Sequence, residues 1–368
     1  MRRDITLDSL RGLFLAIMTI DHLALPLSSY TIHALGFISA AECFVFLSGY
    51  VAGIVYTKLR VIYGKQSLWQ AALQRAGMIY LAHISVFLLL LVTGLYSNFF
   101  VSAWKLNIYN FADPLLLNKP LLALALGSVL LYQPTFLDVL PLYFILVLLM
   151  PFLLEQFIKG RSLMVILASA TLWFIAQFGV LGLITSAVAK YLPIHLGAFD
   201  ILAWQLIFVS GLYLGFLKYQ QRDLTSLLSN KLVIISLIIA TLLFLLRQDL
   251  IAINFLESEA IISKERLGLL RLINFAALVY LVGMLRSKFN KLFEWRWLAG
   301  LGQHSLQVFA FHVGLIFLLA PMQISSLPKI TSFFVTFLVV LSLAIPAKLH
   351  QFYRDYQTVE DTTCSAKA

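Results

Sequence analysis

Apolar segments of membrane-spanning length recur from one end of this 368-residue chain to the other. A helix needs about 20 consecutive, mostly apolar residues to cross the hydrocarbon core of a bilayer. Hydrophobic residues make up 61% of the chain and charged residues 12%, whereas soluble domains are roughly half apolar. The sequence therefore predicts an all-α fold, a polytopic membrane helical bundle with about ten transmembrane helices.

The predicted spans cover residues 6–27, 34–57, 77–97, 138–157, 163–187, 200–217, 232–247, 267–286, 299–320 and 331–349. A further apolar segment, 115–131, is interrupted by Pro120 and Gly127. We expect an interfacial or re-entrant piece there, with an eleventh span as the alternative. Residues 1–349 thus form a single integral-membrane domain, and the polar tail 350–368 is expected to be disordered and cytoplasmic.

Basic residues are distributed unevenly between the predicted loops. With the N-terminus in the cytoplasm, the cytoplasmic segments hold 18 Lys and Arg residues and the outer loops hold 7. This bias follows the positive-inside rule and places both termini in the cytoplasm. The net charge of +10 is therefore explained by basic residues that orient the protein in the membrane. Nucleic acid is not an expected partner, because no basic patch is interleaved with polar surface.

The two cysteines do not predict a disulfide or a metal site. Cys43 lies inside an apolar run and Cys364 lies in the polar tail, and no metal-ligand spacing accompanies them. The basic N-terminus followed by an apolar run loosely resembles a secretory signal. We interpret it as uncleaved, since charges interrupt the run and no small-x-small cleavage site follows.

The first predicted span, "LDSLRGLFLAIMTIDHL" at its centre, holds four ionisable residues. Arg11 and His22 are eleven positions apart, which places them on nearly one helix face and about 16 Å apart along the axis. Asp8 lies within i,i+3 reach of Arg11, whereas Asp21 points about 80–100° away. Because charges in a span usually face the bundle interior, we expect a polar stripe. The alternatives are a structural Asp8–Arg11 pair, a core histidine and an interfacial Asp21.

The second predicted span contains one carboxylate, Glu42. An acid in an apolar run needs a partner. Because a short loop makes the first two helices antiparallel neighbours, Arg11 and His22 are the nearest expected partners. Gly49 and Gly53 form a small-xxx-small motif, which predicts close helix packing.

Later spans carry isolated polar residues. Arg271 lies inside a span and is expected to bind an anion, whereas Trp204 is expected to anchor at the membrane interface. His304 and Ser305 are adjacent, a pairing too common to indicate a nucleophilic dyad. The remaining polar residues of note are Asp138, Tyr143, Gln205, Asn274, Gln307 and His312.

Charges inside a membrane bundle fit two classes of protein. A secondary transporter would show internal repeats and paired helices broken by Gly or Pro, and neither is clear in this chain. A membrane-embedded transferase would need cationic residues for an anionic donor and a general base near the acceptor. Arg11 and Arg271 fit the first requirement, and His22 fits the second because neutral imidazole readily accepts a hydroxyl proton.

Six segments, in order and covering most of the chain, resemble the OpgC family: "RDITLDSLRGLFLAIMTIDHL", "LGFISAAECFVFLSGYVAGIVYTK", "FLDVLPLYFILVLLMPFLL", "FDILAWQLIFVSGLYLGF", "KERLGLLRLINFAALVYL" and "LAGLGQHSLQVFAFHV". The resemblance implies a ten-span protein of the bacterial inner membrane that succinylates osmoregulated periplasmic glucans. The family is similar to a wider group of transmembrane acyltransferases with an Arg-Gly pair and a histidine in the first helix. The matching positions are Arg11, Gly12 and His22, and Ser48 to Tyr50 resemble a motif of the second helix.

The resemblance also implies substrates and partners. The donor is acyl-CoA, in the first instance succinyl-CoA, with no permanently bound cofactor and no metal. The partners are membrane lipid, the periplasmic glucan acceptor and glucan synthesis proteins. Transfer of an acetyl group, or transfer to another surface polysaccharide, remains the alternative.

The expected mechanism assigns roles to eight residues. His22 removes the proton of a glucan hydroxyl, and Glu42 or Asp21 orients His22 as the carboxylate does in catalytic triads. The other five line the donor route: Arg11, Asp8, Ser48, Gln205 and Arg271. Ser48 or Gln205 would donate to the oxyanion, and Arg271 would pair with a succinyl carboxylate, with Arg266 or Lys264 as alternatives. An acyl-histidine intermediate is the alternative to direct transfer.

Overall fold

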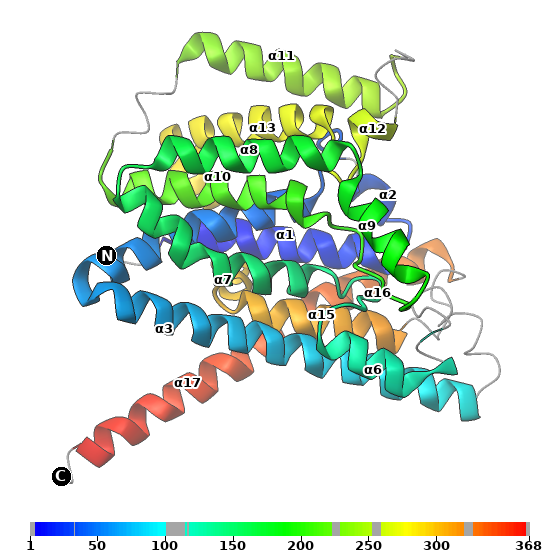
Figure 1. Ribbon diagram of the computed structural model, residues 1–368. Coiled ribbons are helices and arrows are strands. Elements are labelled where there is room, and N and C mark those ends of the chain that lie inside the picture. Colours follow the sequence, from blue (N-terminus) through cyan, green and yellow to red (C-terminus); the bar gives the residue numbers. More distant parts are fainter. Residues whose placement is uncertain are drawn as a thin grey trace.

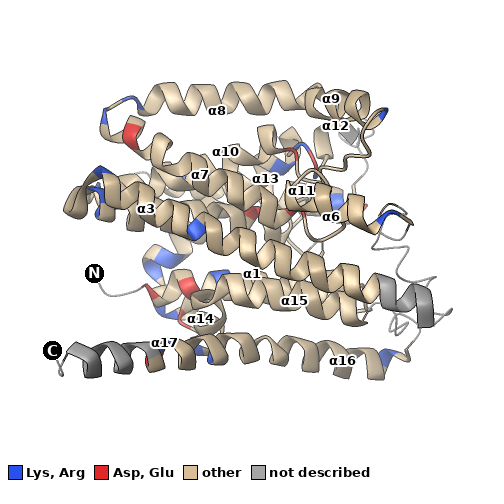
Figure 2. Ribbon diagram, turned by 60° about the horizontal axis from the view of Figure 1, so that its bottom comes forward, with Lys and Arg blue, Asp and Glu red and all other residues tan. Residues whose placement is uncertain are grey.

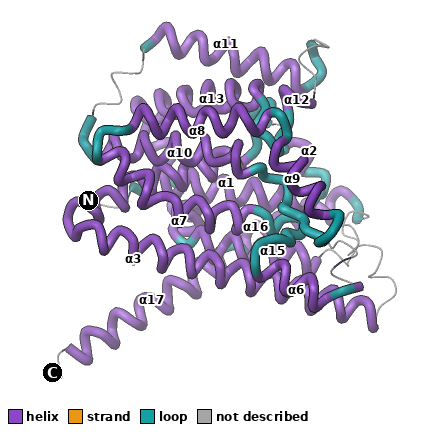
Figure 3. Tube along the Cα trace, in the orientation of Figure 1, coloured by secondary structure: helices purple, strands orange, loops and turns teal. Residues whose placement is uncertain are grey.

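The computed structural model describes residues 4–32, 34–100, 115, 118–222, 229–251, 259–319 and 327–365. Every regular element in those ranges is a helix (Figure 3). The helices are α1 (Ile5–Leu23), α2 (Ser28–Thr31), α3 (Ala40–Phe100), α6 (Pro120–Ser128), α7 (Val139–Ile158), α8 (Ser162–Gln177), α9 (Val180–Ala189), α10 (Ile201–Tyr219), α11 (Asn230–Arg247), α12 (Glu259–Ile262), α13 (Leu269–Lys288), η3 (Asn290–Phe293), α14 (Arg296–Gln303), α15 (Ser305–Leu319), α16 (Lys329–Ser342) and α17 (Ala344–Ser365).

The long helices pack side by side as a bundle, with α1 near its centre (Figure 1). Helix α1 packs mainly on α14, α3 and α15. Helix α11 lies at the edge and packs mainly on α13. Both termini lie at the same end of the bundle (Figure 2), as the even number of predicted spans requires. We call this end the terminal end, and the other the far end.

The predicted spans correspond to elements of the structure. Six helices are long and apolar enough to cross a membrane, or eight if two sharply bent pairs, α8 with α9 and α14 with α15, each count as one span. Helix α3 is two helical arms separated at Gly64, whose φ of 88° and ψ of 179° are not helical. Dividing α3 there, and adding α1 with its charged residues, recovers the ten predicted segments.

Two expectations about the remaining segments are corrected or resolved. Helix α6 has nine residues, about 14 Å at 1.5 Å per residue, so it is too short to be an eleventh span. It packs against α3. The described part of the tail, 350–365, is helical rather than disordered, because α17 continues to Ser365. Residues 101–114 and 116–117, which lie between α3 and α6, are outside the described residues.

Glycines bring α3 and α10 into direct backbone contact. A Cβ atom on Gly49 would lie 2.3 Å from the carbonyl oxygen of Phe208, and one on Gly211 would lie 2.2 Å from that of Phe46. The predicted small-residue packing is therefore confirmed, and its partner is α10. This contact, the most extensive between two helices, holds the first arm of α3 in the bundle interior.

Candidate active site

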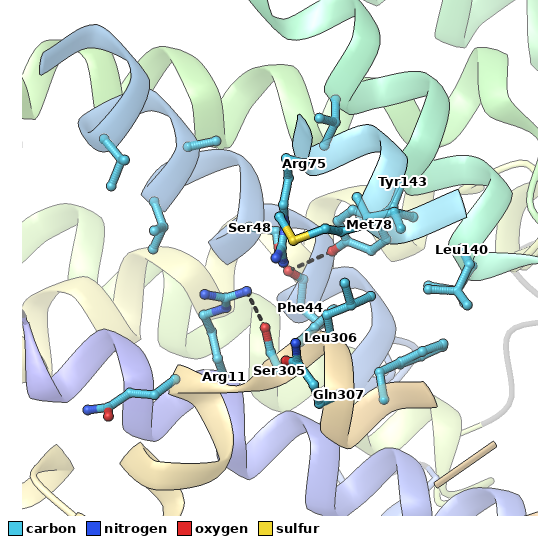
Figure 4. Close-up of a pocket in the computed structure, with 18 of the residues that line it drawn as sticks. Arg11, Phe44, Ser48, Arg75, Met78, Leu140, Tyr143, Ser305, Leu306 and Gln307 are labelled. Atoms are coloured by element: carbon cyan, nitrogen blue, oxygen red, sulfur yellow. Dashed lines mark hydrogen bonds between the residues drawn. The ribbon is translucent and has the colours of Figure 1, made fainter. Parts of the chain in front are cut away.

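Close packing of α1 on α14 places Arg11. A Cβ atom on Gly12 would lie 1.9 Å from the carbonyl oxygen of Leu298, and one on Gly302 would lie 1.9 Å from that of Asp8. Only glycine allows the two backbones to approach this closely. The Arg11 side chain then reaches α15, where its Nη2 donates to Oγ of Ser305 at 2.7 Å (Figure 4).

Arg11 lines a cavity of about 520 Å³, a volume typical of ligand sites. Helices α1, α3, α7, α10, α14, α15 and α17 contribute to its wall. Three arginines from three helices meet there, Arg11, Arg75 and Arg354, together with His350. None of the described residues that line it is Asp or Glu. We call it the arginine cavity, and its lining favours an anionic ligand.

Ser48 and Tyr143 form part of the wall opposite Arg11 (Figure 4). The Tyr143 hydroxyl donates to the backbone carbonyl of Phe44 at 3.1 Å and lies beside the Ser48 hydroxyl. The Arg11 guanidinium carbon lies 5.8 Å from the centroid of the Phe44 ring. Two hydroxyl groups and a guanidinium therefore meet one continuous cavity.

A pair of histidines lies next to the arginine cavity, toward the far end of the bundle. Nδ1 of His22 lies 3.1 Å from Nε2 of His312, and the His22 ring stacks on Phe136 with centroids 4.1 Å apart. Phe309 lines the cavity, and its ring packs edge-on against His312 at 4.9 Å. One aromatic ring thus links the cavity wall to the histidine pair.

Glu42 is not the partner of His22 or Arg11. It is fully buried and forms an ion pair with Arg271 on α13. Its second oxygen accepts from the backbone N–H of Ser39 at 2.9 Å and from the Ser39 hydroxyl at 2.5 Å. The expected partner was wrong because α13, more than 220 positions along the chain, packs there.

The two acids of α1 each contact another part of the bundle. Asp21 accepts from the Thr31 hydroxyl at 2.5 Å, which ties α2 to the end of α1. Asp8 is buried at the contact of α1 with α14. Neither acid is among the residues that line the arginine cavity.

Two predicted residues of α10 serve the packing of the bundle. The Gln205 amide nitrogen donates to the Ser169 carbonyl at 2.8 Å, and its oxygen accepts from the Ser169 hydroxyl at 2.6 Å, which ties α10 to α8. Trp204 is fully buried, so it is not an interfacial anchor. Its indole N–H donates to the backbone carbonyls of Lys264 and Glu265 at 3.1 and 3.0 Å.

Three basic residues of the arginine cavity were not identified as site residues from the sequence. Arg75 was assigned to a loop, and His350 and Arg354 to a disordered tail. A signal was present, because His350 and Arg354 are four residues apart and share one face of any helix that continues there. Within the described ranges no group of three or more His, Cys, Asp and Glu side chains could hold a metal ion.

The fold and the cavity together define an all-α polytopic membrane protein with a cationic internal site. The OpgC protein family model matches residues 3–355, nearly the whole chain. The chain therefore belongs to the OpgC protein family, and this membership implies a membrane-embedded transferase. No curated protein and no solved structure matches the chain.

Proposed function

We propose that the protein transfers an acyl group, in the first instance succinyl, from acyl-CoA to hydroxyl groups of a periplasmic glucan. The observation that carries this proposal is the arrangement of two features along the bundle. An arginine cavity, with no carboxylate among the described residues that line it, lies toward the terminal end, and the pair of the half-buried His22 and the buried His312 lies one aromatic ring beyond it. The first suits an anionic donor, and the second suits proton transfer.

The arginine cavity is the proposed site for the anionic part of the donor. Guanidinium groups bind phosphate through two parallel hydrogen bonds and stay charged at any physiological pH. Arg11, Arg75 and Arg354 come from helices α1, α3 and α17, so the site forms only when these helices pack. The donor is a substrate, and no permanently bound cofactor is needed for the chemistry.

His22 is the proposed general base. A glucan hydroxyl approaches from the far end, and His22 takes its proton while the oxygen attacks the thioester carbonyl. The carbon–sulfur bond then breaks, the new ester forms, and the proton passes from His22 to the departing CoA sulfur. The imidazole is regenerated, so atoms and charge balance over the cycle.

The developing oxyanion needs a hydrogen-bond donor in the cavity wall. Of the two candidates from the sequence, Ser48 lines the cavity, whereas the Gln205 amide is bound to Ser169. We therefore assign this role to Ser48. The neighbouring Tyr143 hydroxyl is held by the Phe44 carbonyl.

A succinyl donor carries a free carboxylate that needs a cationic partner. Arg271 is already neutralised by Glu42, and the guanidinium of Arg266 packs against Gly179. The remaining candidate is Lys264, whose ammonium lies 5.8 Å from the Phe199 ring centroid and within electrostatic range of His22 and Asp21. We therefore assign the acyl carboxylate to Lys264.

The proposed location is the bacterial inner membrane, with both termini in the cytoplasm. This orientation turns the arginine cavity toward the compartment that contains acyl-CoA and the histidine pair toward the periplasm. The acceptor glucan, membrane lipid and glucan synthesis proteins are then the proposed partners.

The test uses purified protein in detergent and labelled succinyl-CoA, with labelled acetyl-CoA in parallel and a β-glucan as acceptor. Wild type is expected to transfer label to the glucan, and the His22→Ala variant is expected to lose transfer. Full activity of that variant would remove His22 from the mechanism. A wild type that transfers no acyl group, yet drives solute uptake in proteoliposomes, would support the transporter alternative.

A further inference from the structure

Nδ1 of His22 faces Nε2 of His312 at 3.1 Å, and the two rings are stacked with centroids 5.3 Å apart. The two nitrogens can share only one proton in a hydrogen bond, since two N–H groups at this distance would repel. His312 is fully buried, and its ring is fixed by Phe309 on one side. The contact therefore fixes both the ring orientation of His22 and the use of its Nδ1 atom.

Each nearby carboxylate has another partner. Glu42 pairs with Arg271, and Asp21 accepts from Thr31. Asp138 accepts from the backbone N–H of Ala198 at 3.0 Å. Among the described residues, His312 is thus the group that hydrogen-bonds to the His22 ring, in the position that a carboxylate holds in a catalytic triad.

The surroundings of His312 favour His22 as the donor of this hydrogen bond. Nδ1 of His312 makes no well-aligned hydrogen bond within the described ranges, yet the Phe309 carbonyl lies close enough to act on the ring. A carbonyl oxygen favours N–H over a lone pair at that atom. A neutral His312 protonated on Nδ1 has a lone pair on Nε2, so it accepts from Nδ1–H of His22.

We propose that His312 is the positioning residue of the site, which holds His22 as the Nδ1–H tautomer and leaves Nε2 of His22 as the basic atom. This inference rests on the proposed role of His22 as general base. When Nε2 takes the hydroxyl proton, the imidazolium donates from Nδ1 to the neutral His312, a charge-assisted hydrogen bond. His312 itself takes up no proton in the cycle.

The experiment compares two substitutions of similar shape. In His312→Gln the side-chain carbonyl replaces the accepting Nε2 lone pair, whereas His312→Met fills the same space without a strong acceptor. We expect His312→Met to lower kcat by about 100-fold or more, and His312→Gln to keep most of kcat. The KM for acyl-CoA should change less than about twofold in both variants, because transition-state orientation rather than donor binding is affected.

Equal kcat values in the two variants, whether both high or both low, would overturn the proposal, as would a raised KM with kcat preserved. If either variant does not fold, His312→Asn, which keeps a side-chain carbonyl, and His312→Leu, which has no acceptor, replace the pair. A double-mutant cycle in the His22→Ala background gives a second, independent measurement. The Met substitution should then add no further loss of residual transfer, since residues acting as a unit are non-additive. An independent further loss there contradicts the proposal. If wild type transfers no acyl group, both the general-base function of His22 and this inference fail. If wild type transfers the group and the transfer depends on His22, the His312 variants test this inference alone.

Discussion

Glu42 and Arg271, 229 positions apart in the chain, form an ion pair in which the carboxylate is fully buried. The pair joins the start of α3 to the first turn of α13. Asn274, one turn further along α13, accepts from the backbone N–H of Phe37 at 2.8 Å. Two residues of α13 thus hold the segment that leads into α3. These contacts favour a structural role for Glu42, Arg271 and Asn274.

The first prediction is that removing one member of this pair destabilises the fold. Replacing Arg271 by Met leaves an uncompensated buried carboxylate, which costs about 3–5 kcal/mol. A variant with Glu42→Gln and Arg271→Met together should recover part of this loss. Thermal unfolding in detergent measures both, with Lys190→Met, an exposed lysine after α9, as the control. If Arg271→Met keeps its stability and loses only succinyl transfer, Arg271 binds substrate instead.

Periodicity and hydropathy were sufficient to predict the helical segments of the bundle, because the signal for each segment lies within about 20 consecutive residues. They were also sufficient to predict the polar face of α1, since Arg11 and His22 follow a helical spacing. The partners of these residues were not predictable in the same way. Glu42 meets Arg271, and His22 meets His312, across more than 200 positions, and hydropathy does not encode which helices pack together.

Helix α17 shows the same limit of sequence-based prediction at the arginine cavity. The low hydropathy of the tail predicts disorder, but α17 continues to Ser365. Two of its residues, His350 and Arg354, line the arginine cavity. A polar helix that extends a span has no apolar signal of its own. Its function is apparent only once α1, α3 and α17 are seen to meet.

The second prediction concerns the contact of Gly12 with Leu298. In Gly12→Ala the new Cβ must displace the backbone of α14, an overpacking cost of about 1–3 kcal/mol. The displacement also moves Arg11 relative to Ser305, so both the melting temperature and acyl transfer should fall. Gly300→Ala, on the opposing helix α14, is the matched control, because a Cβ atom there would have nothing within 4 Å. Equal behaviour of the two variants would show that the close contact of α1 with α14 does not position the site.

The third prediction is that the arginines of the cavity bind the donor. Neutralising Arg75 or Arg354 by substitution with Gln should raise the KM for acyl-CoA about tenfold each, equivalent to about 1.4 kcal/mol. The kcat should stay near wild type, since these groups lie away from the histidine pair. Lys65→Gln removes the same charge from an exposed position on α3 outside the cavity and should leave the KM unchanged. A lower kcat without any change in KM would assign the arginines to the reaction step.

The fourth prediction separates acyl-group selection from donor binding. If Lys264 pairs with the free carboxylate of a succinyl group, Lys264→Met should reduce kcat/KM for succinyl-CoA about tenfold. The value for acetyl-CoA should hardly change, because an acetyl group presents no second charge. The substitution preserves the length of the side chain, and the backbone of this loop stays anchored, because the carbonyls of Lys264 and Glu265 accept from Trp204.

The measurement is the ratio of the two kcat/KM values in wild type and variant, which cancels differences in protein quality. Lys329→Met, at the exposed start of α16, is the control and should keep the wild-type ratio. An unchanged ratio in Lys264→Met would mean that the carboxylate of the donor, if there is one, is recognised elsewhere, and the acetyl alternative would then gain support.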